Sequence, residues 1–131
     1  MERPPTIASE LVQAFVANAH GDLERVQELL AREPMLLNAA WDWGGGDWET
    51  ALGAAAHMGR KDIALYLLEK GARMDIFAAA MLGHVEIVQS FLKAFPAMLH
   101  QRGPHGIPLL AHAQVGGEAA APVVALLEAL Q

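Results

Sequence analysis

Six histidines are the side chains of this sequence best suited to bind a metal ion or to move a proton: His20, His57, His84, His100, His105 and His112. None forms the His-x-x-x-His or His-Glu-x-x-His pair that places two ligands on one helix face. Stacking of neighbouring segments could bring His20 and His57 together. Two imidazoles without a third ligand make a poor site, because protein metal sites use three or four protein ligands. We therefore predict no metal site and no cofactor.

Catalysis has even less support in the sequence. There is no cysteine, no glycine-rich phosphate loop and no Gly-x-Ser-x-Gly motif. Thr50 is expected to cap a helix start with its hydroxyl. Acid–base chemistry by carboxylates and imidazoles around Asp42, Asp47, His57 and His105 would need a pocket that the sequence does not display. We predict that the protein is not an enzyme and assign no catalytic residue.

The segment 41–49 (WDWGGGDWE) holds all three tryptophans of the chain, with acidic residues and three consecutive glycines. Tryptophan is enriched at binding hot spots because a rigid indole buries a large area. One interpretation is that at least one indole packs back onto the protein. The other is that Trp43 or Trp48 faces a partner, with negative charge from Asp42, Asp47 and Glu49. A cationic or arginine-bearing partner would suit such a surface.

The chain repeats itself. An offset of 62 residues superimposes Phe15 on Phe77 and Gly21 on Gly83, and further matches continue to Leu37 and Leu99. Such spacing is typical of stacked supersecondary units that bury their apolar faces against one another.

The segment from Thr50 to Ala72 shows what kind of unit repeats. It has a Thr-x-Leu turn, an alanine-rich first helix ending at Gly59, an Ile-Ala-x-x-Leu-Leu second helix and a terminal Gly-Ala. This resembles the ankyrin repeat, although Ala51 and Gly53 replace the Pro and His of that family's turn. The resemblance implies an all-α, ankyrin-type helical solenoid of about four helix-turn-helix repeats. We expect a single domain over 1–131, with approximate repeats 6–40, 41–74, 75–100 and 101–131.

Two departures from a regular repeat lead to local predictions. Gly59 and Gly83 are only 24 residues apart, against about 33 for this repeat, and the shortfall lies between Gly71 and Gly83. The third repeat is therefore predicted to lack its hairpin finger. Pro34 and Pro96 are predicted to end the helices before them, which can restart as short turns.

Ankyrin repeats usually bind partners through finger tips and the ends of the first helices, along the concave side. The resemblance therefore implies a non-catalytic protein–protein interaction module. The candidate partner-binding residues are His20, Trp43, Asp47, Trp48, Glu49, His57, Met58, Leu82, His105 and Gln114. Two alternatives stay open: a small-molecule or metal-dependent site in the gap left by the missing finger, and an oligomerising structural subunit.

Composition narrows the partner. A net charge of −6 argues against nucleic acid or an anionic membrane, which require a basic face. The absence of cysteine and of a signal-peptide core fits a cytoplasmic protein. In the last helix, Val123, Leu126, Leu127 and Leu130 are predicted to face inward, and Val124, Ala125, Glu128 and Ala129 outward. We expect a monomer rather than a homodimer, binding a protein with a basic or arginine-bearing surface.

Overall fold

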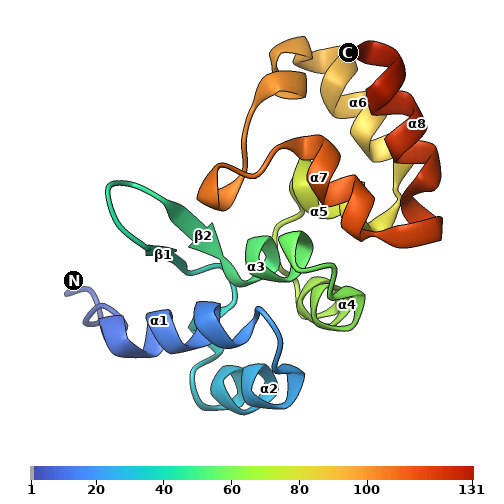
Figure 1. The fold of residues 1–131 in the computed structure, drawn as a ribbon. Helices are drawn as coiled ribbons and strands as arrows, with labels where there is room; N and C mark the ends of the chain where they lie inside the picture. Colours follow the sequence, from blue (N-terminus) through green and yellow to red (C-terminus); the bar gives the residue numbers. More distant parts are fainter. Residues whose placement is uncertain (1) are drawn as a thin grey trace.

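The structure, a computed structural model, describes residues 2–131 and consists mainly of helices that follow one another in pairs (Figure 1). The first helices of the pairs are α1 (Ser9–Asn18), α3 (Ala51–His57), α5 (Ile76–Leu82) and α7 (Leu109–Val115). The second helices are α2 (Leu23–Arg32), α4 (Lys61–Glu69), α6 (Val85–Ala94) and α8 (Ala121–Leu130). Each first helix packs on its own second helix, and the first helices pack in the order α1, α3, α5, α7.

Small residues let the first helices approach closely. Ala54–Ala56 in α3 and Ala78–Ala80 in α5 are fully buried. Gly59 and Gly83 follow these two helices with φ angles of 67° and 81°, so both adopt the left-handed conformation that glycine adopts at least cost. A Cβ atom on Gly83 would lie 2.1 Å from the carbonyl oxygen of Ala119. The backbone of the fourth helix pair therefore packs directly against the backbone of Gly83.

Polar caps and prolines set several helix ends, and those at Thr50, Pro34 and Pro96 agree with the sequence-based predictions. The Thr50 hydroxyl accepts a hydrogen bond from Gly53 N at 3.0 Å, at the start of α3. The Asp75 carboxylate accepts from Ala78 N at 2.8 Å, at the start of α5. α2 and α6 end before Pro34 and Pro96, and short 3₁₀ turns follow, η1 (Pro34–Leu36) and η2 (Pro96–His100).

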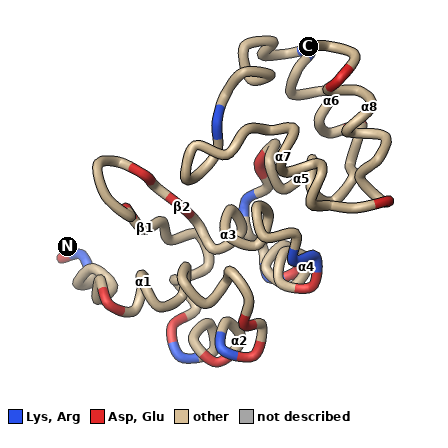
Figure 2. The backbone as a smooth tube through the Cα atoms, viewed as in Figure 1, with Lys and Arg blue, Asp and Glu red and all other residues tan. Residues whose placement is uncertain are grey.

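One β-hairpin projects from the start of α3. Its strands β1 (Ala40–Asp42) and β2 (Trp48–Thr50) are antiparallel, with Trp41 opposite Glu49. The turn is held by Asp42, whose Oδ1 accepts from the backbone N–H groups of Gly44 and Gly46 at 2.8 and 2.9 Å. The hairpin carries only acidic charge, whereas Lys or Arg alternates with Asp and Glu on α2 and α4 (Figure 2).

Two further connections matter for the site. Residues 70–75 join α4 to α5 without a strand. Between α6 and α7, the turn η3 (Pro104–Gly106) is closed by a hydrogen bond from Gly103 N to the carbonyl oxygen of Ile107, at 2.8 Å. A 3₁₀ turn η4 (Gly117–Ala120) separates α7 from α8. None of the helices in residues 2–131 is long and apolar enough to cross a membrane.

Some local expectations for the fourth helix pair need correction. Leu130 is 49% exposed and Leu126 is half-buried, so only Val123 and Leu127 of the four predicted inward residues are fully buried. Val124, predicted outward, is half-buried. The face of α8 that is buried in the core is therefore narrower than the four predicted inward residues suggest.

Candidate functional site

The site is built around Glu49, a carboxylate with an exposed fraction of 1%. Its Oε1 accepts a hydrogen bond from Trp43 Nε1 at 2.8 Å and lies 3.2 Å from His20 Nε2. Its Oε2 lies 3.0 Å from His57 Nε2 and 3.2 Å from His105 Nε2. Burial alone would raise the pKa of Glu49, but the polar contacts with His20, His57 and Trp43 outweigh it and lower the pKa to about 2. Glu49 is therefore an anion at neutral pH.

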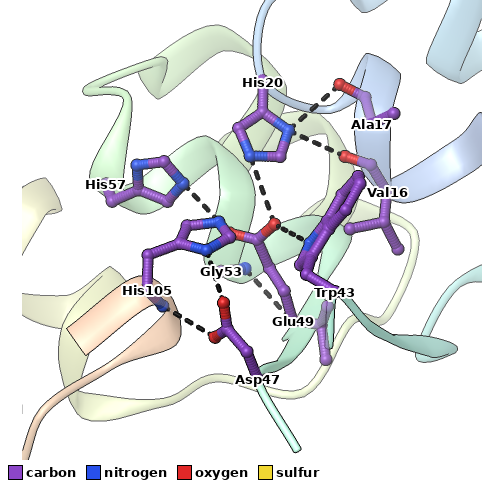
Figure 3. A network of polar contacts seen from close by, with 10 residues as sticks. Val16, Ala17, His20, Trp43, Asp47, Glu49, Gly53, His57 and His105 are labelled. Carbon is purple, nitrogen blue, oxygen red and sulfur yellow. Dashed lines mark hydrogen bonds and ion pairs between the residues drawn. The ribbon is translucent and has the colours of Figure 1, made fainter. Parts of the chain in front are cut away.

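The end of α1 orients His20. Its Nδ1 lies 3.1 Å from the carbonyl oxygen of Val16 and 3.0 Å from that of Ala17, so this nitrogen must carry the proton (Figure 3). The other nitrogen, Nε2, points at Glu49. The contact with the Glu49 carboxylate is the main reason that the pKa of His20 is raised, against the opposing effect of burial.

His105 reaches the same carboxylate from η3, 56 residues further along the chain. Its backbone N–H donates to Asp47 Oδ1 at 2.8 Å, and its Nδ1 lies 2.7 Å from Asp47 Oδ2. With φ at 62°, it is the single non-glycine residue at positive φ within the described chain. Such a conformation persists only where contacts hold it. The hydrogen bond from the His105 backbone is the main reason that the pKa of Asp47 is lowered.

His57 completes the group from the end of α3. Its side chain is 9% exposed. Although its Nε2 is close to Glu49 Oε2, neither atom has a hydrogen bond of acceptable geometry. The rings of His20 and His57 are 5.0 Å apart, and those of His57 and His105 are 5.2 Å apart.

His20, Glu49, His57 and His105 thus form one compact group, here called the His3Glu cluster. One ligand-type atom from each of the four lies within 4.8 Å of the others. The argument that no third ligand stands beside His20 and His57 is therefore wrong: Glu49 and His105 are both there. Sequence reasoning missed this because the two additional groups come from strand β2 and the turn η3, outside the four helix pairs.

The structure sorts the ten predicted partner-binding residues into two sets. Six meet in or beside the His3Glu cluster: His20, Trp43, Asp47, Glu49, His57 and His105. Four lie outside it: Trp48, Met58, Leu82 and Gln114. Glu49 is not the exposed charge that the sequence suggested, because its carboxylate is buried among imidazoles. Asp42 and Asp47 are likewise engaged, by the hairpin turn and by His105.

A hollow of about 380 Å³ lies beside the cluster, between the hairpin and η3. Trp48, Phe77 and Pro104 form its apolar wall, and Asp75 is its most buried charge. Burial is the main reason that the pKa of Asp75 is raised, and the hydrogen bond from Ala78 N opposes this effect. Trp48 is 62% exposed, whereas Trp43, which binds Glu49, is 37% exposed.

Comparison with known families identifies the class of helix pair. The family model described as Ankyrin repeat matches residues 47–78, which run from the hairpin tip through α3 and α4 into α5. The chain therefore contains an ankyrin repeat, as the segment from Thr50 to Ala72 suggested. Ankyrin repeats are generally protein–protein interaction modules. No curated protein matches the chain.

Proposed function

We propose that this protein is an ankyrin-type solenoid of four repeats that binds another protein through the face carrying the hairpin, η3 and the ends of the first helices. The match at 47–78 and the serial packing of four helix pairs support this proposal. We interpret residues 70–75, which hold no strand, as the remnant of a lost third finger. The hollow beside Trp48 would then be the gap in the finger row.

The exposed indole of Trp48 is the observation that carries the proposal. Within residues 2–131, the indole N–H of Trp48 donates no hydrogen bond, so hydrogen bonding does not account for a tryptophan at this position. Trp48 lines the hollow together with Phe77. A partly exposed aromatic residue beside a concave surface is typical of an interaction hot spot. Met58, which is 50% exposed, adds a second exposed apolar side chain at the other end of α3.

The charge in the hollow indicates the chemistry of the partner. Asp75 forms no ion pair with Lys or Arg among residues 2–131. Arg102 also lines the hollow, but its Nη1 donates to the carbonyl oxygen of Gly106. A lysine or arginine side chain of a partner, inserted between Trp48 and Phe77, would combine a cation–π contact with neutralisation of the half-buried carboxylate. The proposed partner is therefore a protein segment with a basic residue flanked by apolar ones.

Selection from a random peptide library displayed on phage tests this proposal on the purified chain. Selected peptides should be enriched in Arg or Lys beside apolar residues. Trp48→Ala should weaken their binding about 30-fold, which corresponds to a hot-spot loss of about 2 kcal/mol. Asp75→Asn removes the charge and keeps a good helix cap, and it should weaken binding about 10-fold.

Leu65→Ala provides the matched control, because Leu65 is equally exposed but lies on α4, away from the hollow. It should leave peptide binding unchanged. Selected peptides without basic residues, or peptides that bind Trp48→Ala as tightly as the original chain, would contradict the proposal.

A further inference from the structure

The three imidazoles of the His3Glu cluster point the same ring atom at one carboxylate. His20 and His105 each direct Nδ1 at an acceptor, a backbone carbonyl in one case and Asp47 in the other. In the neutral ring the proton then lies on Nδ1 and a lone pair on Nε2. Two lone pairs would face the oxygens of Glu49 at 3.2 Å, which is unfavourable unless something positive lies between them.

The buried charge leads to the same requirement. Glu49 is an anion almost fully removed from water, and no Lys or Arg of the described chain forms an ion pair with it. An isolated buried carboxylate is strongly destabilising unless it is paired or coordinates a metal. In addition, Glu49 Oε2 and His57 Nε2 are buried without a hydrogen-bond partner.

We propose that His20, His57 and His105, through their Nε2 atoms, and Glu49, through its carboxylate, bind one divalent transition-metal ion, with Zn²⁺ as the reference ion. Imidazole and carboxylate are established zinc ligands, and four protein ligands complete a tetrahedral shell. The site is distinct from the protein-binding hollow, because Trp48 and Asp75 contribute nothing to it.

The distances in the cluster suit this ion. Zinc bonds of 2.0–2.1 Å place tetrahedral ligands about 3.4 Å apart. The three His–Glu49 contacts, at 3.0–3.2 Å, are already close to that spacing. The widest separation, 4.8 Å, would close if each side chain moved inward by less than about 1 Å.

The groups behind the ligands also match a metal centre. Metal-bound histidines almost always donate their second ring N–H to a carbonyl or carboxylate, which fixes the tautomer and the ring orientation. The Nδ1 of His20 makes such a contact with the carbonyl oxygens of Val16 and Ala17, and the Nδ1 of His105 makes one with the carboxylate of Asp47. Trp43 holds Glu49 Oε1 from the other side. Asp47 is thus a positioning residue, which acts on the ion through His105.

A closed shell of four protein ligands indicates a structural ion. The ligands come from the end of α1, from β2, from the end of α3 and from η3. The ion would tie the turn of the fourth helix pair to the first two pairs, across 85 residues of chain between His20 and His105. It should therefore stabilise the fold and fix one wall of the adjacent hollow.

Zinc titration of the full chain tests the proposal. The protein is purified without a histidine tag, stripped with a chelator and titrated against a chromophoric zinc indicator. We expect one Zn²⁺ per chain with Kd below about 1 µM, and a rise on the order of 10 °C in the unfolding midpoint at a hundredfold excess over Kd. Co²⁺ should give the intense visible absorption of four-coordinate cobalt.

Ligand variants then locate the site. His57→Ala, Glu49→Gln and His105→Asn should each weaken Zn²⁺ binding at least about 100-fold, and Asp47→Asn about 10–100-fold. Asparagine is chosen at position 105 because it tolerates the left-handed backbone. His84→Ala and His100→Ala, which remove exposed histidines elsewhere, should leave Kd unchanged.

Each outcome decides the matter. Unchanged Kd in His105→Asn, equal losses in the His84→Ala and His100→Ala controls, or cobalt spectra of six-coordinate type would overturn the proposal. Absence of tight Zn²⁺ binding to the original chain would also overturn it, and would leave a metal-free cage in which Glu49 is held by the Trp43 N–H and by His20. If circular dichroism shows that His57→Ala is unfolded, the exposed-turn variant His105→Asn decides instead.

Discussion

Glu49 and Asp75 are carboxylates at the starts of two successive first helices, in opposite electrostatic surroundings. Glu49 comes just before the cap of α3, and Asp75 is itself the cap of α5. The pKa of Glu49 is lowered to about 2, since polar contacts from His20, His57 and Trp43 overcome its burial. The pKa of Asp75 is raised, because burial there outweighs the hydrogen bond from Ala78 N.

The difference shows what each region is organised to do. Around Glu49 the protein supplies the N–H of Trp43 and three imidazoles, and these polar groups converge on one point. Around Asp75 the backbone N–H of Ala78 is the main group that opposes burial, His112 and the backbone of Phe77 oppose it less, and the carboxylate lines the hollow. In our proposals, the first region lacks only a metal ion, and the second takes a basic side chain from a partner. Four variants test this contrast in protein kept free of metal by a chelator.

The largest effect is expected from Glu49→Gln. We predict that it lowers the free energy of unfolding by roughly 2–4 kcal/mol at pH 7, because in metal-free protein the anion is held by the Trp43 N–H and by His20, whose pKa is raised by the contact with Glu49. The pKa of Glu49 is lower in the folded state than in the unfolded state, so its contribution is present above pH 4.5 and is lost as the pH falls toward 2.

Urea unfolding at pH 7 and at several lower pH values measures this. The curves of the original chain and of Glu49→Gln should converge as the pH falls below 4.5. A constant gap over that range would show that the carboxylate charge is not what stabilises the cluster.

The two partly exposed tryptophans give the next effect. Trp43→Phe should cost roughly 1–3 kcal/mol, because it removes the N–H that binds Glu49 Oε1 at 2.8 Å. Trp48→Phe should change stability by less than about 0.5 kcal/mol, since Trp48 is mainly exposed and forms no such bond. Thermal unfolding of the pair checks this, and equal losses would remove the distinction between a structural and a partner-facing tryptophan.

Local features of the fold were accessible from the sequence because each depends on neighbours in the chain. The alanine run before Gly59 predicted a first helix, Thr50 predicted a cap, and Pro34 predicted a helix end. Each of these residues acts through its own φ angle, hydroxyl or missing N–H. The burial of the α8 side chains was harder to predict from the sequence, because the burial of Leu130 depends on whether another segment packs against the end of the helix.

The cluster was only half accessible. Six of the ten candidate residues meet there, although they were proposed as a partner-binding surface, and the pairing of His20 with His57 follows from stacked helix ends. Its chemistry was not predicted, because it depends on the lateral approach of η3 to the hairpin, seen in the contact of His105 with Asp47. The spacing of residues along the sequence does not predict such a contact between η3 and the hairpin. The positive φ of His105 is equally invisible in a sequence that places it between proline and glycine.

The smallest effect is expected from Asp75→Asn, and its pH dependence sharpens the comparison. The pKa of Asp75 is higher in the folded state than in the unfolded state, so the folded protein binds the proton more readily. Ionised Asp75 therefore costs stability at neutral pH, and this cost disappears as the pH falls through the folded pKa toward 3.8. Asparagine retains the cap and removes the charge. The variant should be as stable as the original chain or more so at pH 7, with an advantage that shrinks on acidification, opposite in sign to the Glu49→Gln loss. Urea unfolding between pH 7 and pH 4 measures the stability of the Asp75→Asn variant and of the original chain. A variant that is clearly destabilised at pH 7 would mean that the carboxylate already has an internal partner. That result would remove the reason for a basic side chain in the hollow.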